Sequence, residues 1–382
     1  MFDRLVSFIR DQYATTEFIP LHAPVFRGRE RELVLDTIDS TFVSSVGAYV
    51  DRLERDTAAF CGSPRAVAVM NGTAALHISL VLAGVERDDL VVTQSLTFVA
   101  TCNAIAYCGA QPLFIDVDRR TMGLSPTALD AWLQEHALID DAGECRTREG
   151  HRRIRACVPM HTFGHPVDLD ALVEVCERWH LVLIEDAAES LGSYYKGRHT
   201  GTFGRVGVLS FNGNKVMTTG GGGMLLTDED IGKRAKHLTT TAKIPHPYEF
   251  VHDEVGYNYR MPNLNAALGC AQLEQLPDFL ESKRVLAERY IDFFKDSEFQ
   301  PIVEPEGCRS NYWLNGVVCQ SGVQRDALLK WTNDAGVMTR PIWTLMTRLS
   351  LYSNALRGPL ENAEWLEARV VNLPSSVLPV GS

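Results

Sequence analysis

The sequence lacks the features that mark several protein classes. Its nine cysteines form no C-x-x-C pair, which argues against a zinc site or a disulfide framework and predicts buried thiols in a reducing compartment. No apolar run approaches the roughly 20 residues that cross a membrane, and charges interrupt the apolar positions of the first residues, unlike a signal peptide. Low-complexity tracts and internal repeats are also missing. We therefore expect a cytoplasmic protein that does not associate with membranes.

Basic charge is scarce. The 382 residues include 37 Lys and Arg against 48 Asp and Glu, which gives a formal net charge of −11 at pH 7. This acidic balance disfavours a broad footprint on a phosphate backbone, although one local basic pocket can still bind a small anion. We therefore do not expect nucleic acid as a partner. Hydrophobic residues make up 45% and charged residues 22%, a globular composition that excludes a disordered or collagen-like chain.

The length predicts two domains, the first of the α/β class. Short apolar runs alternate with helical patterns, which predicts a mostly parallel central sheet with helices on both faces. A further run, residues 223–226, follows its predecessor too closely for a crossover helix, so we expect it to be antiparallel. The predicted parallel strands are residues 66–70, 90–93, 112–117, 157–161, 181–184 and 206–211.

The C-terminal third of the sequence has a different pattern of apolar and polar residues. Residues 263–294 have a helical pattern, and a smaller α+β region follows. We predict a large domain over residues 15–262, a small domain over residues 263–382, and an N-terminal helix at residues 1–14 that packs on the rest. Within the small domain we expect strands at 312–319 and 337–342 and a helix at 325–333.

Three motifs carry chemistry. The first, Asn71-Gly72-Thr73-Ala74-Ala75-Leu76, follows a predicted strand and opens an amphipathic helix, with Thr73 at or near the cap. A helix N-terminus offers unpaired N–H groups and the positive end of a dipole, which suits a phosphate. Taken alone, however, the motif is explained more simply by a capping threonine.

The second motif, Glu185-Asp186-Ala187-Ala188-Glu189, places carboxylates at the end of a buried strand, where ligands of α/β sheets gather. Asp186 needs a partner there, either a protonated ring nitrogen or a salt bridge to a neighbouring helix. The third motif places Lys215 between an apolar strand and a glycine tetrad, residues 220–223. A desolvated lysine can form a Schiff base, whereas the glycines alone indicate a flexible hairpin. Together the three motifs indicate a cofactor site.

In this order, N-G-T-x-A-L-H, T-F-x-A-T-x-N-A-I (97–105), E-D-A-A, S-F-x-x-x-K and Y-N-Y-R-M (257–261) make the chain resemble the DegT-type nucleotide-sugar aminotransferases. These are pyridoxal 5′-phosphate (PLP) enzymes of fold type I, and the likeness runs from Ile19 to near the C-terminus. The branch it most resembles includes enzymes of legionaminic-acid-type 4-amino-sugar pathways.

The resemblance implies roles for individual residues. Lys215 would form the Schiff base and shuttle the proton, and Asp186 would pair with the ring nitrogen. Phe98 would stack on the ring. Glu189 stands where the family often has Gln or His near the phenolic oxygen. The phosphate-binding residues would be Gly72, Thr73, Ala74 and Ser210, with Asn258 reaching the phosphate from a second subunit.

The implied reaction transfers an amino group from glutamate to C4 of a nucleotide-linked 4-keto-6-deoxy hexose, expected to be a UDP- or GDP-linked 2-acetamido sugar. A homodimer with shared active sites is implied as well. The alternatives are a 3-keto-sugar aminotransferase, another fold-type I enzyme such as a lyase, and a non-catalytic regulatory relative.

A few residues outside these motifs bear on the site. His161 and His165 are four apart, but Gly164 and Pro166 break the helix that a metal pair would need, so we expect no metal site. We predict that His161 lines the active site. Arg260 is either an interface residue or a ligand for the substrate phosphate. Trp343 is a candidate to border the sugar.

Overall fold

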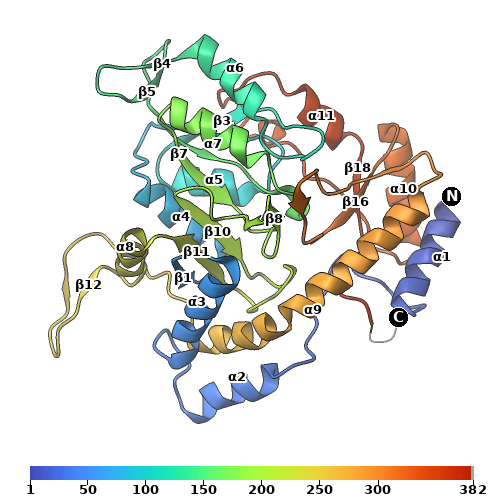
Figure 1. Cartoon of the computed structure of the whole chain (residues 1–382), viewed down its shortest axis with the longest axis horizontal. Coiled ribbons are helices and arrows are strands. Elements are labelled where there is room, and N and C mark those ends of the chain that lie inside the picture. The colour runs from blue at the N-terminus through green and yellow to red at the C-terminus, as the bar shows by residue number, and fades with distance from the viewer. Residues whose placement is uncertain (380–382) are drawn as a thin grey trace.

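The computed structural model describes residues 1–379, and a seven-stranded sheet forms its centre (Figure 1). One strand, β11, is antiparallel to both of its neighbours, whereas the remaining neighbours pair in parallel. Both the mostly parallel sheet and the single antiparallel strand were predicted from the sequence and are confirmed. In spatial order the strands are β1 (Arg65–Val69), β11 (Gly223–Thr227), β10 (Val206–Ser210), β7 (Val182–Asp186), β6 (Ile154–Val158), β2 (Leu90–Gln94) and β3 (Gln111–Ile115).

Helices cover both faces of the sheet because successive strand residues point to opposite sides. On β1, Val67 and Val69 pack against α4 (Gly72–Leu82), α5 (Val99–Tyr107) and α8 (Glu229–Thr239). Ala66 and Ala68 pack on the other face, under α3 (Ala48–Cys61) and the beginning of α9 (Asn263–Phe294). The rest of that face is covered by α6 (Pro126–His136) and α7 (Leu169–Arg178).

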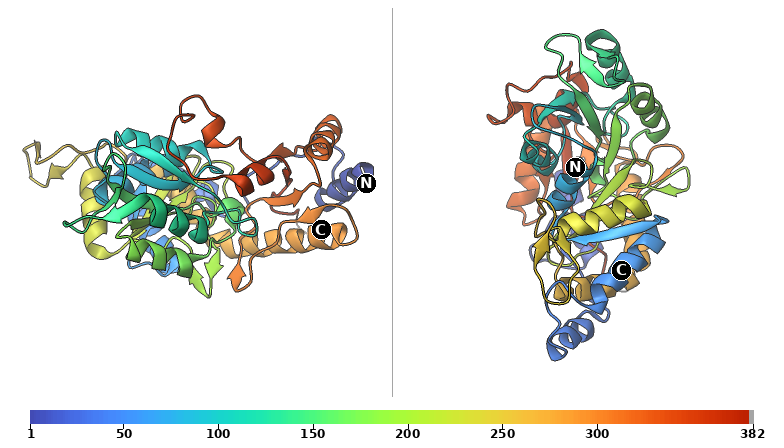
Figure 2. Two further views of the ribbon diagram at one scale, coloured as in Figure 1. Left: turned by 90° about the horizontal axis from the view of Figure 1, so that it is seen from above. Right: turned by 90° about the vertical axis from the view of Figure 1, so that its left-hand side faces the viewer.

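A second, smaller sheet lies beside the C-terminal half of α9 (Figures 1 and 2). It is antiparallel throughout and shares a core with the last turns of α9 and with α1 (Phe2–Tyr13). The N-terminal helix therefore packs on the small sheet. The strands are, in order, β14 (Gln300–Pro301), β16 (Asn315–Val318), β18 (Val370–Leu373) and β17 (Arg340–Pro341), and nearby helices are α10 (Gly322–Asp334) and α11 (Glu361–Glu367). Helix α2 (Glu30–Asp39) instead packs on the first half of α9.

The helix α9 belongs to both cores. Its residues from Ala266 to Leu276 pack with the central sheet, whereas those from Leu286 to Phe294 pack with the small sheet. Because one continuous helix of 32 residues joins the two cores, the division of the chain at residue 263 stays a prediction.

Two strands of the small domain are shorter than predicted. The run at 312–319 is a strand only over Asn315–Val318, because side chains take the preceding backbone N–H groups. The N–H of Tyr312 donates to Ser310 Oγ and that of Trp313 donates to Asn311 Oδ1, so these residues form a turn. The run at 337–342 pairs with β18 only at Arg340–Pro341.

Several short strands pair with one another outside the two main sheets. The pair β12 (Lys243–Ile244) and β13 (Val251–His252) closes an arm, residues 243–255, that projects from the body (Figures 1 and 2). Among the described residues no helix is both long and apolar enough to cross a membrane. All nine cysteines are free, and seven of them are buried. The other short strands are β4 (Ala137–Ile139), β5 (Cys145–Thr147), β8 (Tyr194–Tyr195), β9 (Arg198–His199) and β15 (Cys308–Arg309).

A fully buried amine lies where the two cores meet. Lys283 on α9 is inaccessible to solvent, and its Nζ donates to the carbonyls of Trp313 (3.2 Å) and Ser375 (2.5 Å) and contacts His22 Nε2 at 2.8 Å. Desolvation by burial lowers the pKa of Lys283 from its ordinary 10.5 to about 7.

This shift predicts a pH-dependent stability. Between about pH 7 and 10.5 the unfolded chain binds more protons at Lys283 than the folded chain, so stability should rise with pH. Relative to Lys283→Met, the wild-type free energy of unfolding should gain at most about 1.4 kcal/mol per pH unit in that window. Urea denaturation at pH 7 and pH 9 measures it. The exposed lysine variant Lys330→Met is the control, and parallel pH curves for wild type and Lys283→Met would contradict the assignment.

Candidate active site

A cavity of about 370 Å³ opens at the carboxyl ends of the parallel strands. This edge is where open α/β sheets bind ligands. The predicted residues Gly72, Thr73, Phe98, Asp186, Glu189, Ser210 and Lys215 all line it, together with Asn71, Leu76, Ala100, Met160, Ala188, Asn212, Asn214, Gly222, Trp313 and Trp343. The three sequence motifs, which extend from Asn71 to Lys215 along the chain, thus meet in one place.

The side chains that line the cavity therefore come from distant parts of the chain, and the sheet brings them together.

The first motif forms the N-terminus of α4 at one side of the cavity. Its N-cap is Asn71, whose Oδ1 accepts the N–H of Ala74 at 2.8 Å. Thr73 lies in the first turn, near the cap as expected. Ala74, whose amide Asn71 engages, does not line the cavity, which corrects the role expected for it. Gly72 lies beside Ser210 from β10, and both line the cavity with Thr73, so this corner combines a helix N-terminus with two hydroxyl groups.

The glycine tetrad allows β11 to begin directly under this corner. A Cβ on Gly223 would lie 2.6 Å from the carbonyl carbon and oxygen of Asn71 and 2.8 Å from the nitrogen of Gly72. Gly220 has a φ of +78°, which a glycine adopts at little cost. The tetrad is therefore a turn followed by a close backbone contact, and not the flexible hairpin that the glycines alone indicated. It forms the floor of this corner.

Asp186 ends β7 and is 3% exposed. Its Oδ2 accepts the hydroxyl of Thr101 at 2.6 Å, and its Oδ1 accepts the N–H of Ala188 at 3.2 Å. Burial raises the pKa of Asp186, and the hydrogen bonds from these two neutral donors and the charge of Lys215 oppose that rise. A cationic N–H inside the cavity would stabilise this carboxylate further.

The amine of Lys215 lies between a carboxylate and an aromatic ring. Its Nζ is 3.2 Å from Glu189 Oε1 and 3.9 Å from the centroid of the Trp313 ring. Glu189 is buried, and its Oε2 accepts the N–H of Phe163 at 2.9 Å. Burial raises the pKa of Glu189, whereas Lys215 and the Phe163 N–H lower it. Among residues 1–379 this is the only lysine on the cavity wall, and two groups of different chemistry hold it.

His161 does not line the cavity, which corrects the prediction made for it. The side chain is completely buried behind β7, where Nε2 lies 3.1 Å from Glu185 Oε2 and Nδ1 accepts the N–H of Val167. Glu185 also accepts the N–H groups of Gly201, Phe203 and Gly204. The pair therefore holds the strand end that carries Asp186, without facing the ligand.

Asn258 and Arg260 are exposed and lie outside this cavity. Their segment runs along the edge of the sheet, where Arg260 bridges to Val69 and Asn258 to Thr240. Arg260 instead borders a second hollow of about 500 Å³ with Lys243 and His246, at the base of the arm. Within one chain, then, these two residues do not reach the site of Lys215.

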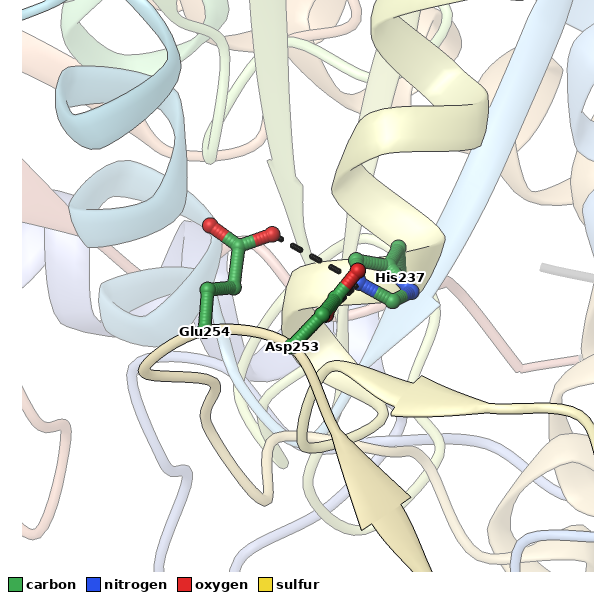
Figure 3. Close-up of side chains that lie close together, drawn as sticks. All are labelled: His237, Asp253 and Glu254. Atoms are coloured by element: carbon green, nitrogen blue, oxygen red, sulfur yellow. Dashed lines mark hydrogen bonds and ion pairs between the residues drawn. The ribbon is translucent and has the colours of Figure 1, made fainter.

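One group of side chains outside the cavity has metal-ligand types. His237, Asp253 and Glu254 converge below the arm, with His237 Nε2 2.7 Å from Asp253 Oδ1 and 3.5 Å from Glu254 Oε1 (Figure 3). Glu254 also forms an ion pair with Arg234, whose positive charge opposes a bound cation. We interpret the group as an anchor of the arm to α8.

Sequence reasoning missed several residues of the site. Trp313 was not selected, because it reaches the cavity only when the small domain folds back, and no local pattern marks such a contact. Asn214, which accepts the indole N–H of Trp313, was also missed. Thr101 and Asn71 stood inside quoted motifs, so their motif positions were the signal for them. Trp343 does line the cavity.

Comparisons with known proteins agree with this geometry. The model of the DegT/DnrJ/EryC1/StrS aminotransferase family matches residues 25–378. The chain belongs to this family. It is 35% identical to the GDP-perosamine synthase of Escherichia coli O157:H7 over 361 residues, which are 94% of this chain and 93% of that protein.

Two further relatives support the assignment. EpsN of Bacillus subtilis, whose name describes a pyridoxal phosphate-dependent aminotransferase, is 35% identical over 342 residues, covering 88% of this chain and 84% of EpsN. The crystal structure of the aminotransferase TlmJ from Streptoalloteichus hindustanus superposes with a TM-score of 0.84 at 30% identity, covering 94% of this chain and 93% of TlmJ. The protein is thus a PLP-dependent sugar aminotransferase of the DegT family, as the sequence motifs predicted.

The residues present fit PLP. The corner at Gly72, Thr73 and Ser210 offers a helix N-terminus to a phosphate, and the buried Asp186 lacks a cationic donor of its own and suits a protonated ring nitrogen. Phe98, which is 50% exposed, lies on the cavity wall and offers a ring face. Lys215 supplies the amine.

The floor of the cofactor corner should tolerate no side chain on Gly223. In Gly223→Ala the added methyl group meets the backbone of Asn71, so the first turn of α4 must shift. We expect about 1–3 kcal/mol lower stability and PLP binding weakened by about tenfold or more, measured by denaturation and by titration with PLP. The control is Gly213→Ala, whose Cβ meets nothing within 4 Å and should change stability by less than about 0.5 kcal/mol. Equal effects of the two variants would contradict the close contact.

Proposed function

We propose that this aminotransferase transfers an amino group from glutamate to C4 of a GDP-linked 4-keto-6-deoxy hexose, with Lys215 as the residue that joins the cofactor. The observation that carries the proposal is the placement of the Lys215 amine inside the cavity, beside Glu189 and in the same pocket as Asp186. The nine free cysteines agree with a reducing compartment, and we place the enzyme in the cytoplasm.

The name of the relative from E. coli supports the nucleotide. GDP is one of the two nucleotides that the sequence indicated, and perosamine is a 4-amino sugar, which favours C4 over C3. The acetamido group expected at C2 stays a prediction. A panel of UDP- and GDP-linked 3-keto and 4-keto sugars, with glutamate as the donor, separates the proposed reaction from a 3-keto-sugar aminotransferase.

When bound, PLP withdraws electrons from the carbon that loses its proton. The residues of this chain do the remaining work. Asp186 holds a proton on the ring nitrogen, and Thr101 keeps the carboxylate in place through its hydroxyl group. Lys215 would carry the proton between the reacting carbons, because its amine lies on the cavity wall at the end of a flexible stem. Trp313 and Trp343 exclude water from that side of the amine.

We propose further that the enzyme is a homodimer with shared active sites. Half of the Phe98 side chain is exposed, so the cavity is open on that side in a single chain. Asn258 and Arg260 lie on the surface, and the arm exposes Tyr248, Phe250 and Val255. A second copy that covers these apolar side chains would bring Asn258 to the phosphate corner and the basic hollow at Lys243 and Arg260 to the nucleotide.

Lys215→Ala should abolish both the visible absorbance of the PLP-loaded protein and turnover, because no other amine lines the cavity. Absorbance spectra and an amino-transfer assay measure the two effects. Lys196→Ala, which removes an exposed lysine paired with Asp170, should leave both unchanged. Turnover by Lys215→Ala at the wild-type rate would remove the proposed mechanism.

Mixing two inactive variants tests the shared site. Asn258→Ala should lower activity through phosphate binding, and Lys215→Ala should have none. In a dimer that exchanges subunits, the mixed species has one site with neither substitution, so an equal mixture should recover about a quarter of the wild-type activity. Size-exclusion chromatography checks that mixed dimers form. A mixture no more active than the sum of its components would show that Asn258 serves its own chain.

A further inference from the structure

Every polar group of Trp313 is held by another part of the protein. Its backbone N–H donates to Asn311 Oδ1 at 2.8 Å, and its indole N–H donates to the carbonyl of Asn214 at 2.6 Å. Its carbonyl accepts the Nζ of Lys283 at 3.2 Å. Because the residue is 4% exposed and tied at three points, its ring has one orientation in this fold.

That orientation sets the ring against the amine of Lys215, 3.9 Å from the ring centroid to Nζ. A cation over an indole face is attracted by the ring quadrupole, most strongly where water is excluded. Asn311 also donates to the carbonyls of Glu189 and Leu191, each at 2.9 Å. The same side chain therefore fixes the ring and the backbone of Glu189, the two neighbours of the amine.

Lys283 is an unusual residue with which to hold a carbonyl. Its side chain is fully buried, and among residues 1–379 no carboxylate forms an ion pair with it. Its three contacts are the carbonyls of Trp313 and Ser375 and the Nε2 of His22. A buried amine without an acid costs free energy that an apolar side chain would not. The contacts of Lys283 therefore indicate that its amine fixes the positions of the groups that it joins.

We propose that Lys283 is a positioning residue for this enzyme: through the carbonyl of Trp313 it keeps the indole face against the nitrogen of Lys215 and so stabilises positive charge there. The inference rests on the proposed function, since the nitrogen in question is the one that joins the cofactor. Other titratable groups near this nitrogen are Glu189 beside it, Asp186 in the same cavity and His22 beyond Trp313, whose pKa burial and the charges of Lys283 and Lys215 lower.

The test follows the visible absorbance of the PLP-loaded enzyme as a function of pH, because the band reports the protonation of the nitrogen of Lys215 joined to PLP. In Trp313→Phe, which loses the indole and its bond to Asn214, the midpoint should move to lower pH by about 0.5 to 1 unit. Lys283→Met should move it in the same direction. In Lys283→Met, kcat should fall by about three- to tenfold, with a smaller change in KM for glutamate.

The direction in which the midpoint moves separates a positioning role of Lys283 from the simple loss of its charge. Loss of a nearby positive charge alone would raise the midpoint, because protonation would then meet less repulsion. Tyr290→Phe is the matched control: Tyr290 is also buried on α9, and its hydroxyl donates to the carbonyl of Pro374, next to Ser375, but it does not touch Trp313. It should lower thermal stability and leave the midpoint unchanged.

The possible results separate a failure of this inference from a failure of the proposed function. A midpoint that stays or rises in Lys283→Met, or that falls equally in Tyr290→Phe, overturns the inference while the proposed function stands. Should Lys283→Met fail to fold, Trp313→Phe decides, and an unshifted midpoint in that variant also overturns it. A wild-type enzyme without any visible band would remove the proposed function and this inference together.

Discussion

The site depends on one constraint, the burial of two carboxylates beside a single amine. Asp186 and Glu189 are both almost inaccessible to solvent, and burial raises the pKa of each. Lys215 opposes that rise at both groups. Hydroxyl and backbone N–H donors supply the rest of the compensation, at Thr101 and Ala188 for Asp186 and at Phe163 for Glu189. The two buried carboxylates thus favour a positively charged group in the cavity before any ligand binds.

The central sheet makes this arrangement possible because its strand ends converge. β1 leads into α4, whose N-terminus suits a phosphate, β7 ends in Asp186, and β10 ends in Ser210 shortly before Lys215. The antiparallel β11 runs between β1 and β10, and its first residue, Gly223, lies against the backbone of Asn71. This close backbone contact fixes the distance between the N-terminus of α4 and the strand that leads to Lys215.

The small domain adds the wall that the sheet lacks. Trp313 and Trp343 come from beyond α9 and close the cavity over the amine. The backbone of Trp313 is held by two buried polar side chains, Asn311 and Lys283, and not by a strand ladder. Because side chains take these backbone groups, β16 begins only at Asn315. The same hydrogen bonds fix the position of the Trp313 ring, which a flexible loop would not do.

Much of this protein follows from its sequence alone. Apolar runs separated by helix-length segments determined the parallel sheet, and the short link to residues 223–226 determined the antiparallel strand, because backbone geometry permits few connections of that length. The motifs at Gly72, Asp186 and Lys215 likewise predicted residues that the structure brings together in one cavity. Tertiary structure alone decided that His161 turns away to Glu185 and that Trp313 covers the amine. These contacts join residues distant in the chain, and they depend on how side chains compete for the same buried donors and acceptors, which no local pattern records.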